Sequence, residues 1–205
     1  MPDDQLPAVS PEAEKAKDTV KEGIVTSLRA VNAVEEEIVS LVRNTVANTL
    51  KATGSVAKTS LDTIREVVKG AIEATEEVGA GLTLTTKSVA KGVILGVKDV
   101  GGDVIEAASV TAQALVKNAA SVGGDVAVTA KRAVDGTVEA IIETGGNVAE
   151  VAKSAAVGAI QAAGEIGNAA VQSVRDVMLG IVGGIKEVIG SVLPKKDRDT
   201  TDEKQ

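Results

Sequence analysis

The chain of 205 residues contains no Phe, Trp, Tyr, Cys or His. Without aromatic residues it lacks the side chains that supply much of an ordinary core and the rings on which nucleic-acid bases stack. Without cysteine it forms no disulfide or thiolate metal site, and without histidine it lacks the usual general base. Ser-His-Asp and Cys-His catalysis are therefore excluded. We expect a protein that is not an enzyme and that holds no metal or cofactor.

The apolar residues that are present are small, with 33 Val, 31 Ala, 13 Ile, 11 Leu and 2 Met. Lys and Arg total 22 and Asp and Glu total 29, so the net charge is −7. This negative charge argues against nucleic acid as a partner. The glycine-rich segments match neither of the common phosphate-binding patterns, and we expect no small-molecule substrate.

Proline is confined to the ends of the chain and divides it into three parts. Residues 1–11 are predicted to be a disordered N-terminal segment, 12–193 an amphipathic helical repeat region, and 194–205 a charged disordered tail. The acidic start shows no signal peptide. The longest uncharged stretches are about ten residues, whereas a membrane-spanning helix needs about 20 apolar residues. We therefore expect a cytoplasmic protein, peripheral to a lipid or granule surface, with no transmembrane helix.

The repeat region has a period of 22 residues, visible in its glycines. One set of glycines recurs at that spacing, namely Gly79, Gly101, Gly123, Gly145 and Gly167. Twenty-two residues make about six turns at 3.67 residues per turn, so a position repeated at 22 or 11 residues stays on one face of a helix. Alternation with period two, typical of strands, is scarce. The sequence thus predicts an all-α protein of long amphipathic helices from tandem 22-residue (2 × 11) repeats.

Apolar residues follow the same period and form a stripe on one helix face. We predict that this stripe faces a lipid or a partner. Its members are Leu28, Val34, Ile38, Leu50, Val56, Ile72, Val78, Leu82, Ile94, Val100, Val104, Val116, Val122, Val126, Val138, Val148, Ile160, Ile166, Val182, Val188 and Val192.

Charged residues also recur with this period, in two sets that we call the basic column and the acidic column. The basic column lies at one edge of the apolar stripe and comprises Lys21, Arg43, Arg65, Lys87, Lys131, Lys153 and Arg175, with Ser109 as its exception. The acidic column lies nearly opposite the stripe and comprises Glu77, Asp99, Glu143, Glu165 and Glu187, with Ser121 as its exception. The basic side chains are predicted either to reach lipid phosphates at an interface or to pair with acids on neighbouring helices.

Glycine pairs are the natural points at which such a helix breaks, because glycine disfavours a helix interior by about 1 kcal/mol relative to alanine. We predict hinges at four pairs, Gly101 and Gly102, Gly123 and Gly124, Gly145 and Gly146, and Gly183 and Gly184. Asp103, Asp125 and Asn147 follow the first three pairs, either as N-caps after a break or as polar-face residues of a continuous helix. The chain is accordingly either an extended rod or a set of hairpins folded at the hinges.

Tandem 11- and 22-residue amphipathic repeats resemble lipid-surface proteins of the exchangeable apolipoprotein, synuclein, perilipin or phasin type. The resemblance covers residues 12–193 as a pattern, with one local match to the synuclein repeat at Lys21-Glu22-Gly23-Ile24-Val25. It implies a non-catalytic protein that coats or stabilises a lipid droplet, a polyester granule or a membrane. This chain departs from that pattern because its stripe is built from Val and Ala and lacks bulky anchors.

Two other functions fit the same pattern. The first is a structural protein that self-associates into a homo-oligomer, either as a right-handed coiled coil, which an 11-residue repeat favours, or as a helical bundle. The second is a stress protectant similar to late-embryogenesis-abundant proteins, although those are usually more polar than this chain, whose mean hydropathy is +0.16.

Overall fold

The computed structural model describes residues 11–53, 57–78 and 81–192, and these are helical apart from short turns. The predicted all-α class is confirmed. The helices are α1 (Pro11–Thr53), α2 (Ala57–Val78), α3 (Leu82–Asp99), α4 (Val104–Ser121), α5 (Val126–Thr144), α6 (Val148–Ile166) and α7 (Asn168–Val192). The predicted segment 1–11, except Pro11, and the predicted tail 194–205 lie outside the described residues.

The helices α3 to α6 begin one repeat period apart, at Leu82, Val104, Val126 and Val148. Each period therefore contains a helix and the turn that follows it. A continuous rod does not form over this part of the chain, because each of these helices ends in a turn after about one period. The helices are folded onto one another, although alternate helices pack together more extensively than consecutive ones, unlike the expected hairpins.

The turns are made by residues that favour them. Gly101, Gly123 and Gly145 have φ angles of 71°, 73° and 77°, a left-handed conformation that glycine adopts without steric cost. Asp103 then accepts hydrogen bonds from the backbone N–H groups of Ile105 and Glu106, at 2.9 and 3.0 Å. Such N-caps satisfy donors that the first turn of a helix leaves free.

The other two predicted caps behave alike. The side chain of Asp125 accepts from the N–H groups of Ala127 and Val128, and that of Asn147 accepts from the N–H of Glu150. Of the two alternatives for these polar residues, the structure therefore selects the N-cap.

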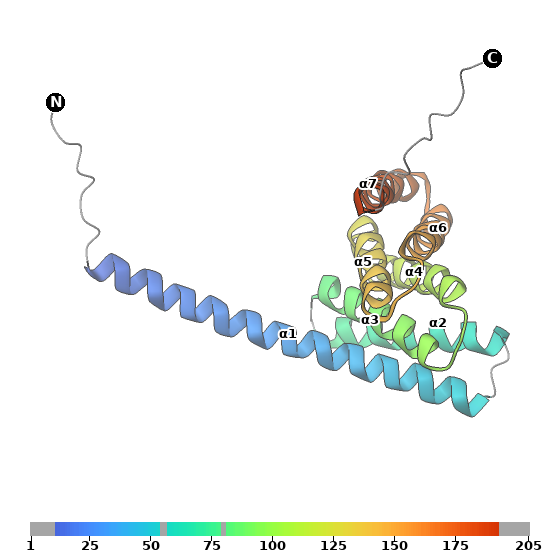
Figure 1. Ribbon diagram of the computed structural model, residues 1–205, viewed down its shortest axis with the longest axis horizontal. Helices are drawn as coiled ribbons and strands as arrows, with labels where there is room; N and C mark the ends of the chain where they lie inside the picture. Colours follow the sequence, from blue (N-terminus) through green and yellow to red (C-terminus); the bar gives the residue numbers. More distant parts are fainter. Residues whose placement is uncertain (1–10, 54–56, 79–80, 193–205) are drawn as a thin grey trace, which may run out of the picture.

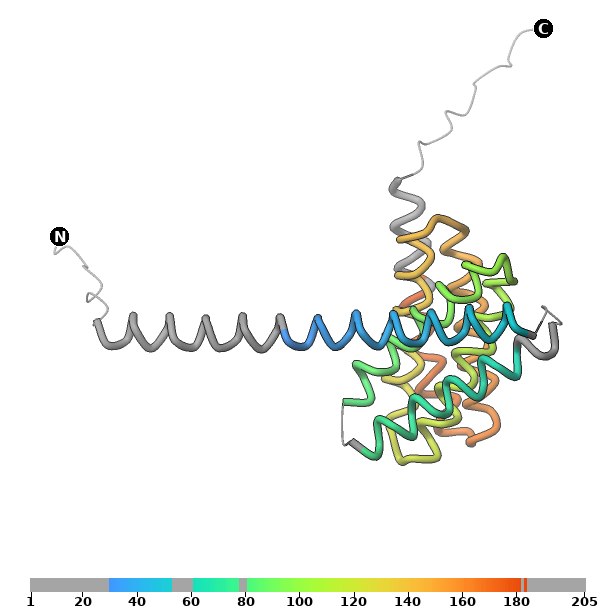
Figure 2. The backbone as a smooth tube through the Cα atoms, turned by 90° about the horizontal axis from the view of Figure 1, so that it is seen from below, coloured from blue at the N-terminus to red at the C-terminus, as the bar shows by residue number. Residues whose placement is uncertain are grey.

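The helices are arranged as a stack in which each helix packs on the next one and on the one after that. Contacts between α1 and α3, α3 and α5, and α4 and α6 are the most extensive. Figure 1 shows α1 and α2 at one end of the stack and α7 at the other, with α3 to α6 between them. Viewed from below, α1 and α2 lie in front of the other helices (Figure 2).

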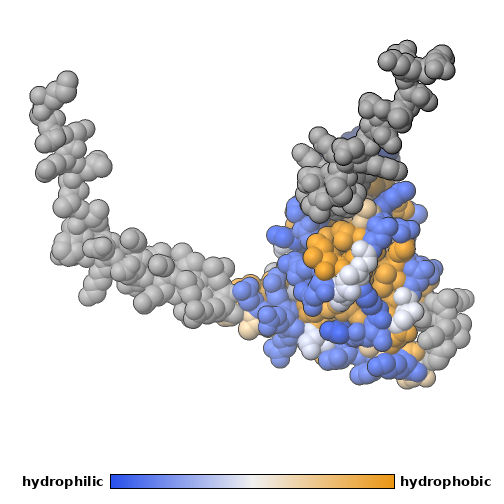
Figure 3. Space-filling view, viewed as in Figure 1, coloured by the Kyte–Doolittle hydropathy of each residue, from blue (hydrophilic) through white to orange (hydrophobic). Residues whose placement is uncertain are grey.

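The core is continuous through the stack and is built from small side chains. Two positions of the repeat are buried in every helix. One comprises Val46, Val68, Ala90, Ala112, Val134, Ala156 and Met178, and the other comprises Val42, Ile64, Thr86, Ala108, Ala130, Ala152 and Val174. Hydrophobic residues also reach the surface of the stack, where hydrophilic ones surround and cross them (Figure 3).

Glycines let the helix backbones approach closely. A Cβ at Gly136 would overlap the carbonyl oxygen of Lys87, and one at Gly158 would overlap that of Ser109. Gly92 and Gly96, which form a GxxxG pair, lie in the same way against the backbone of α1. The small residues thus serve close packing within the chain.

No helix in the described part of the chain is long and apolar enough to cross a membrane.

Candidate functional site

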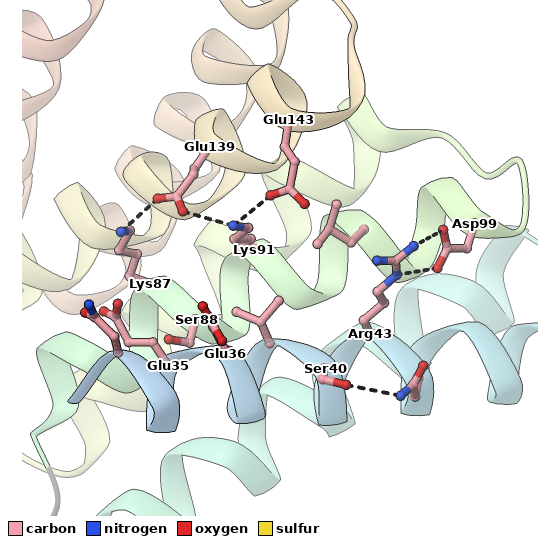
Figure 4. Close-up of a pocket in the computed structure, with 14 residues that line it drawn as sticks. Glu35, Glu36, Ser40, Arg43, Lys87, Ser88, Lys91, Asp99, Glu139 and Glu143 are labelled. Carbon is pink, nitrogen blue, oxygen red and sulfur yellow. Dashed lines mark hydrogen bonds and ion pairs between the residues drawn. The ribbon is translucent and has the colours of Figure 1, made fainter. Parts of the chain in front are cut away.

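An open groove of about 700 Å³ lies across α1, α3 and α5. Its walls carry charges of both signs, as Figure 4 shows. Acidic residues are contributed by all three helices and basic residues by α1 and α3. The charged residues lining it are Glu35, Glu36, Arg43, Lys87, Lys91, Asp99, Glu139 and Glu143.

At one end of the groove an ion pair joins α1 to α3 (Figure 4). Arg43 donates two hydrogen bonds to the carboxylate of Asp99, from Nε at 2.6 Å and from Nη2 at 2.8 Å. These bonds hold the pKa of Asp99 below its usual value and raise the pKa of Arg43. The two-pronged geometry fixes the register of α1 on α3 more firmly than a single contact would.

The middle of the groove holds a ladder of ion pairs between α3 and α5. Glu139 binds Lys87 at 2.8 Å and Lys91 at 3.0 Å, and Lys91 also binds Glu143 at 2.8 Å. Burial alone would raise the pKa of Glu139, but the hydrogen bonds from the two lysines outweigh burial and lower it. Burial likewise opposes the charge of Lys91, whose pKa is nevertheless raised by its bonds to Glu143 and Glu139.

The two charged columns supply only part of this network. Acids of one helix meet basic residues of the helix two positions earlier, as in Asp99 with Arg43 and Glu165 with Lys117. Of these pairs only Arg43 and Asp99 join one column to the other, and Glu139, Lys91 and Lys117 belong to neither column. Sequence reasoning found both columns but missed these pairs. In the structure an acid and its base on alternate helices lie 48 to 56 residues apart, and the 22-residue period does not specify this separation.

The basic column is divided by its surroundings. Arg43 and Lys87 pair with acids on neighbouring helices, the second of the two alternatives given above. Arg65 and Lys131 pair within their own helices, with Asp62 and Asp135. A third group consists of Lys153 and Arg175, which are exposed and form no ion pair with the described residues. The side chain of Lys21 lies outside the described residues.

The predicted apolar stripe is spread between core and surface. Leu50, Ile72, Ile94 and Val116 are buried among the other helices, so in the folded chain they face its own core and not an outside surface. Val34 and Ile166 are exposed. Nine members are half-buried at the margin of the core, namely Ile38, Leu82, Val100, Val104, Val122, Val126, Val138, Val148 and Ile160. The side chains of Leu28, Val56, Val78, Val182, Val188 and Val192 lie outside the described residues.

Three of the predicted hinge pairs lie in turns between helices, at residues 101 and 102, 123 and 124, and 145 and 146. Whether the chain moves there stays a prediction. The break expected at Gly183 and Gly184 is wrong, because α7 continues through both residues to Val192. The first three pairs are followed by an N-capping Asp or Asn, whereas Gly184 is followed by Ile185, which offers no capping oxygen.

Three of the groove's five carboxylates, those of Asp99, Glu139 and Glu143, are engaged by lysine or arginine. No group of three or more acids in the described ranges is placed to hold a metal ion. Ion pairs in the groove join α1 to α3 and α3 to α5. They therefore stabilise the packing of these three helices.

Compared with known proteins, the sequence matches no family model and no curated protein.

Proposed function

We propose that this chain is a non-catalytic helical protein that coats or stabilises a hydrophobic surface such as a lipid droplet, a polyester granule or a membrane. The observation that carries the proposal is an uncovered apolar face on α1. Val31, Val34 and Leu41 are 43%, 48% and 67% exposed. They are three and seven residues apart and therefore lie on one side of the helix.

This face extends along α1 to the point where the helix leaves the stack. Residues 30–34 are all exposed, whereas Val42 and Val46, about two and three turns after residue 34, are buried against the other helices. A helix without a packing partner is marginal in water. Covering the face removes apolar area from water, at about 25 cal/mol per Å², so an apolar surface stabilises this part of α1.

The charges near this face favour a neutral surface over an anionic one. Three acids, Glu35, Glu36 and Glu37, lie between Val34 and Leu41 in the sequence of α1, and the whole chain carries a net charge of −7. Anionic lipids attract basic segments and repel acidic ones. The proposed partner is therefore an uncharged lipid or polyester surface, bound reversibly because the side chains are too small to anchor deeply.

The buried members of the apolar stripe require a further step. Leu50, Ile72 and Ile94 reach a surface only if the helices separate, whereas the α1 face needs no rearrangement. We infer that α1 makes the first contact and that the buried residues reach the surface only after it.

Flotation of the full-length protein with triolein droplets coated in phosphatidylcholine tests this function. We expect the wild type to float with the droplets, and a Val31→Ser/Val34→Ser/Leu41→Ser variant to bind at least about tenfold more weakly, because it loses the apolar contact area. The control is Ile142→Ser, which removes from α5 one apolar residue that is as exposed as Leu41, at 68% and 67%. Absence of wild-type binding, or equal losses in the variant and the control, would contradict the proposal.

A further inference from the structure

The last helix, α7, is joined to the stack by a turn that differs from the three turns before it. Ala169 occupies the repeat position of the N-capping residues Asp125 and Asn147, and alanine has no side-chain oxygen with which to cap a helix. The helix instead begins at Asn168, directly after Gly167. Gly167 has a φ angle of 145°, whereas the first glycines of the other three turns have values between 71° and 77°. The chain thus enters α7 with a different backbone geometry.

The close backbone packing of the stack is not continued by α7. Gly180 shares its repeat position with Gly136 and Gly158, which lie against the backbones of α3 and α4. A Cβ at Gly180 would meet nothing within 4 Å. Among the described residues, the contacts of α7 with α5 are also less extensive than those of α5 with α3 or of α6 with α4. The attachment of α7 is therefore the weaker one.

Polar contacts do not compensate for this looser packing. Ion pairs join α1 to α3, α3 to α5 and α4 to α6. None of the described residues of α7 makes a side-chain hydrogen bond or an ion pair with another helix. Val174 and Met178 are buried against the core. Apolar contact alone thus attaches the described part of α7 to α5 and α6.

The side of α7 that meets the stack is a continuous apolar strip, which we call the α7 face. It comprises Val171, Val174, Met178 and Ile181, which are three or four residues apart and so lie on one side of the helix. The two central residues are buried, and the two outer ones are half-buried at the margin of the core. An apolar face of this kind can be covered either by the stack or by another apolar surface.

The composition of α7 suits an uncharged surface better than water. Its 25 residues include two basic and two acidic ones, so the helix has no net charge. They also include four glycines, each of which disfavours a helix by about 1 kcal/mol relative to alanine. A helix of this composition is unstable in water without a packing partner. We therefore expect α7 to stay on the stack until another apolar surface covers its face.

We propose that α7 separates from α5 and α6 at an uncharged apolar surface and binds that surface through the α7 face, while α1 to α6 stay together. This inference rests on the proposed function, in which α1 makes the first contact, and it names the second helix that binds. Because α7 lies at the end of the stack (Figure 1), it separates without displacing another helix. The apolar area that it uncovers on α5 and α6 is then open to the same surface.

Hydrogen exchange of the full-length protein in lipid-free buffer, followed by mass spectrometry, tests the weak attachment. We expect the amides of α7 to exchange at least about tenfold faster than those of α4, because α7 opens without the rest of the stack. Val174→Ser is expected to speed exchange in α7 at least about tenfold further and to leave α4 unchanged. The matched control is Leu179→Ser, which changes a residue of the same helix that is 68% exposed and lies outside the α7 face. It is expected to leave exchange unchanged.

Photolabelling tests binding by α7. The full-length protein is floated with triolein droplets coated in phosphatidylcholine that carries a photoreactive acyl chain, and mass spectrometry locates the label. We expect label in residues 31–41 of α1 and 171–181 of α7, and none in α3 or α4. Val174→Ser is expected to reduce the label in α7 and to leave the label in α1 unchanged, whereas Leu179→Ser is expected to change neither.

Three results would overturn the proposal while leaving the surface-coating function intact. They are exchange of α7 as slow as that of α4, label confined to α1 in protein that floats, and label spread through α3 and α4. A wild type that does not float would overturn both the surface-coating function and the binding of α7. Circular dichroism verifies that each variant is folded.

Discussion

At the scale of single residues, the core combines very small apolar side chains with threonines whose hydroxyls are mostly satisfied. The exception is Thr111 of α4, which is fully buried and whose Oγ1 has no hydrogen-bond partner among the residues that the structure describes. Thr137 of α5, also fully buried, donates its hydroxyl to the carbonyl of Val134 at 2.8 Å. Valine occupies the same repeat position as Thr111 at Val89 of α3, where it is fully buried.

We therefore expect Thr111→Val to increase the free energy of unfolding by about 1 kcal/mol, because it removes an unsatisfied buried hydroxyl. Thr137→Val is the matched control and is expected to give no gain, because that hydroxyl is already bonded. Urea unfolding followed by circular dichroism measures both variants. Equal effects of the two substitutions would show that the missing hydrogen bond at Thr111 has no energetic weight.

At the scale of helices, glycine has opposite effects at two positions of α6. A Cβ at Gly158 would collide with backbone atoms of Ser109 in α4, which cannot turn aside as a side chain can. Gly164, also in α6, has nothing within 4 Å. Gly158→Ala is expected to destabilise the protein by about 1–3 kcal/mol through overpacking. Gly164→Ala is expected to stabilise it by about 0.5–1 kcal/mol through helix propensity.

Urea unfolding of the two variants measures this difference directly. If Gly158→Ala were as stable as the wild type, α4 and α6 would not approach as closely as the structure places them. Because both substitutions lie in one helix, the comparison separates close packing from helix propensity.

Helix ends were more predictable than helix faces. Asp103, Asp125 and Asn147 indicate their N-caps in the sequence, because capping needs only a glycine turn and a local polar oxygen. The inward face was harder to predict, since the helices are closest where Ala and Gly lie, as at Ala112 and Gly158. A prediction of the buried face from the positions of Val, Ile and Leu therefore places its centre too close to the edge of the core. Val104 and Val126, which such a prediction puts in the buried face, are only half-buried.

At the scale of the whole molecule, ion pairs between helices couple stability to pH. The pKa values of Asp99 and Glu139 are lowered in the folded chain from their ordinary values of 3.8 and 4.5. Between the lowered and the ordinary values the unfolded chain binds more protons, so stability rises with pH there. The contribution is complete above the ordinary values and is lost as the pH falls through the lowered ones.

We therefore expect the free-energy difference between the wild type and an Asp99→Asn/Glu139→Gln variant to be largest near pH 6–7 and to shrink below about pH 4.5. Urea unfolding at a series of pH values gives this difference, and the other carboxylates cancel because both proteins carry them. A difference that does not change between pH 7 and pH 3 would mean that these pairs add nothing to stability.

The long-range pairing of charges was beyond sequence reasoning for a physical reason. The 22-residue period fits one face of a continuous helix and equally fits a helix followed by a turn, so the period alone does not place Arg43 beside Asp99. That placement depends on how alternate helices pack on each other, as α1 and α3 do, and the period does not specify this packing.

The pattern of packing, in which a helix touches only its neighbours one and two positions along the chain, also bears on how the protein folds. No contact between the described helices waits for a distant part of the chain, because partners lie at most two helices apart. Folding of such a stack can nucleate at more than one place. Any three consecutive helices contain every kind of contact that the stack uses, and folding can therefore start at any of them and spread toward both ends.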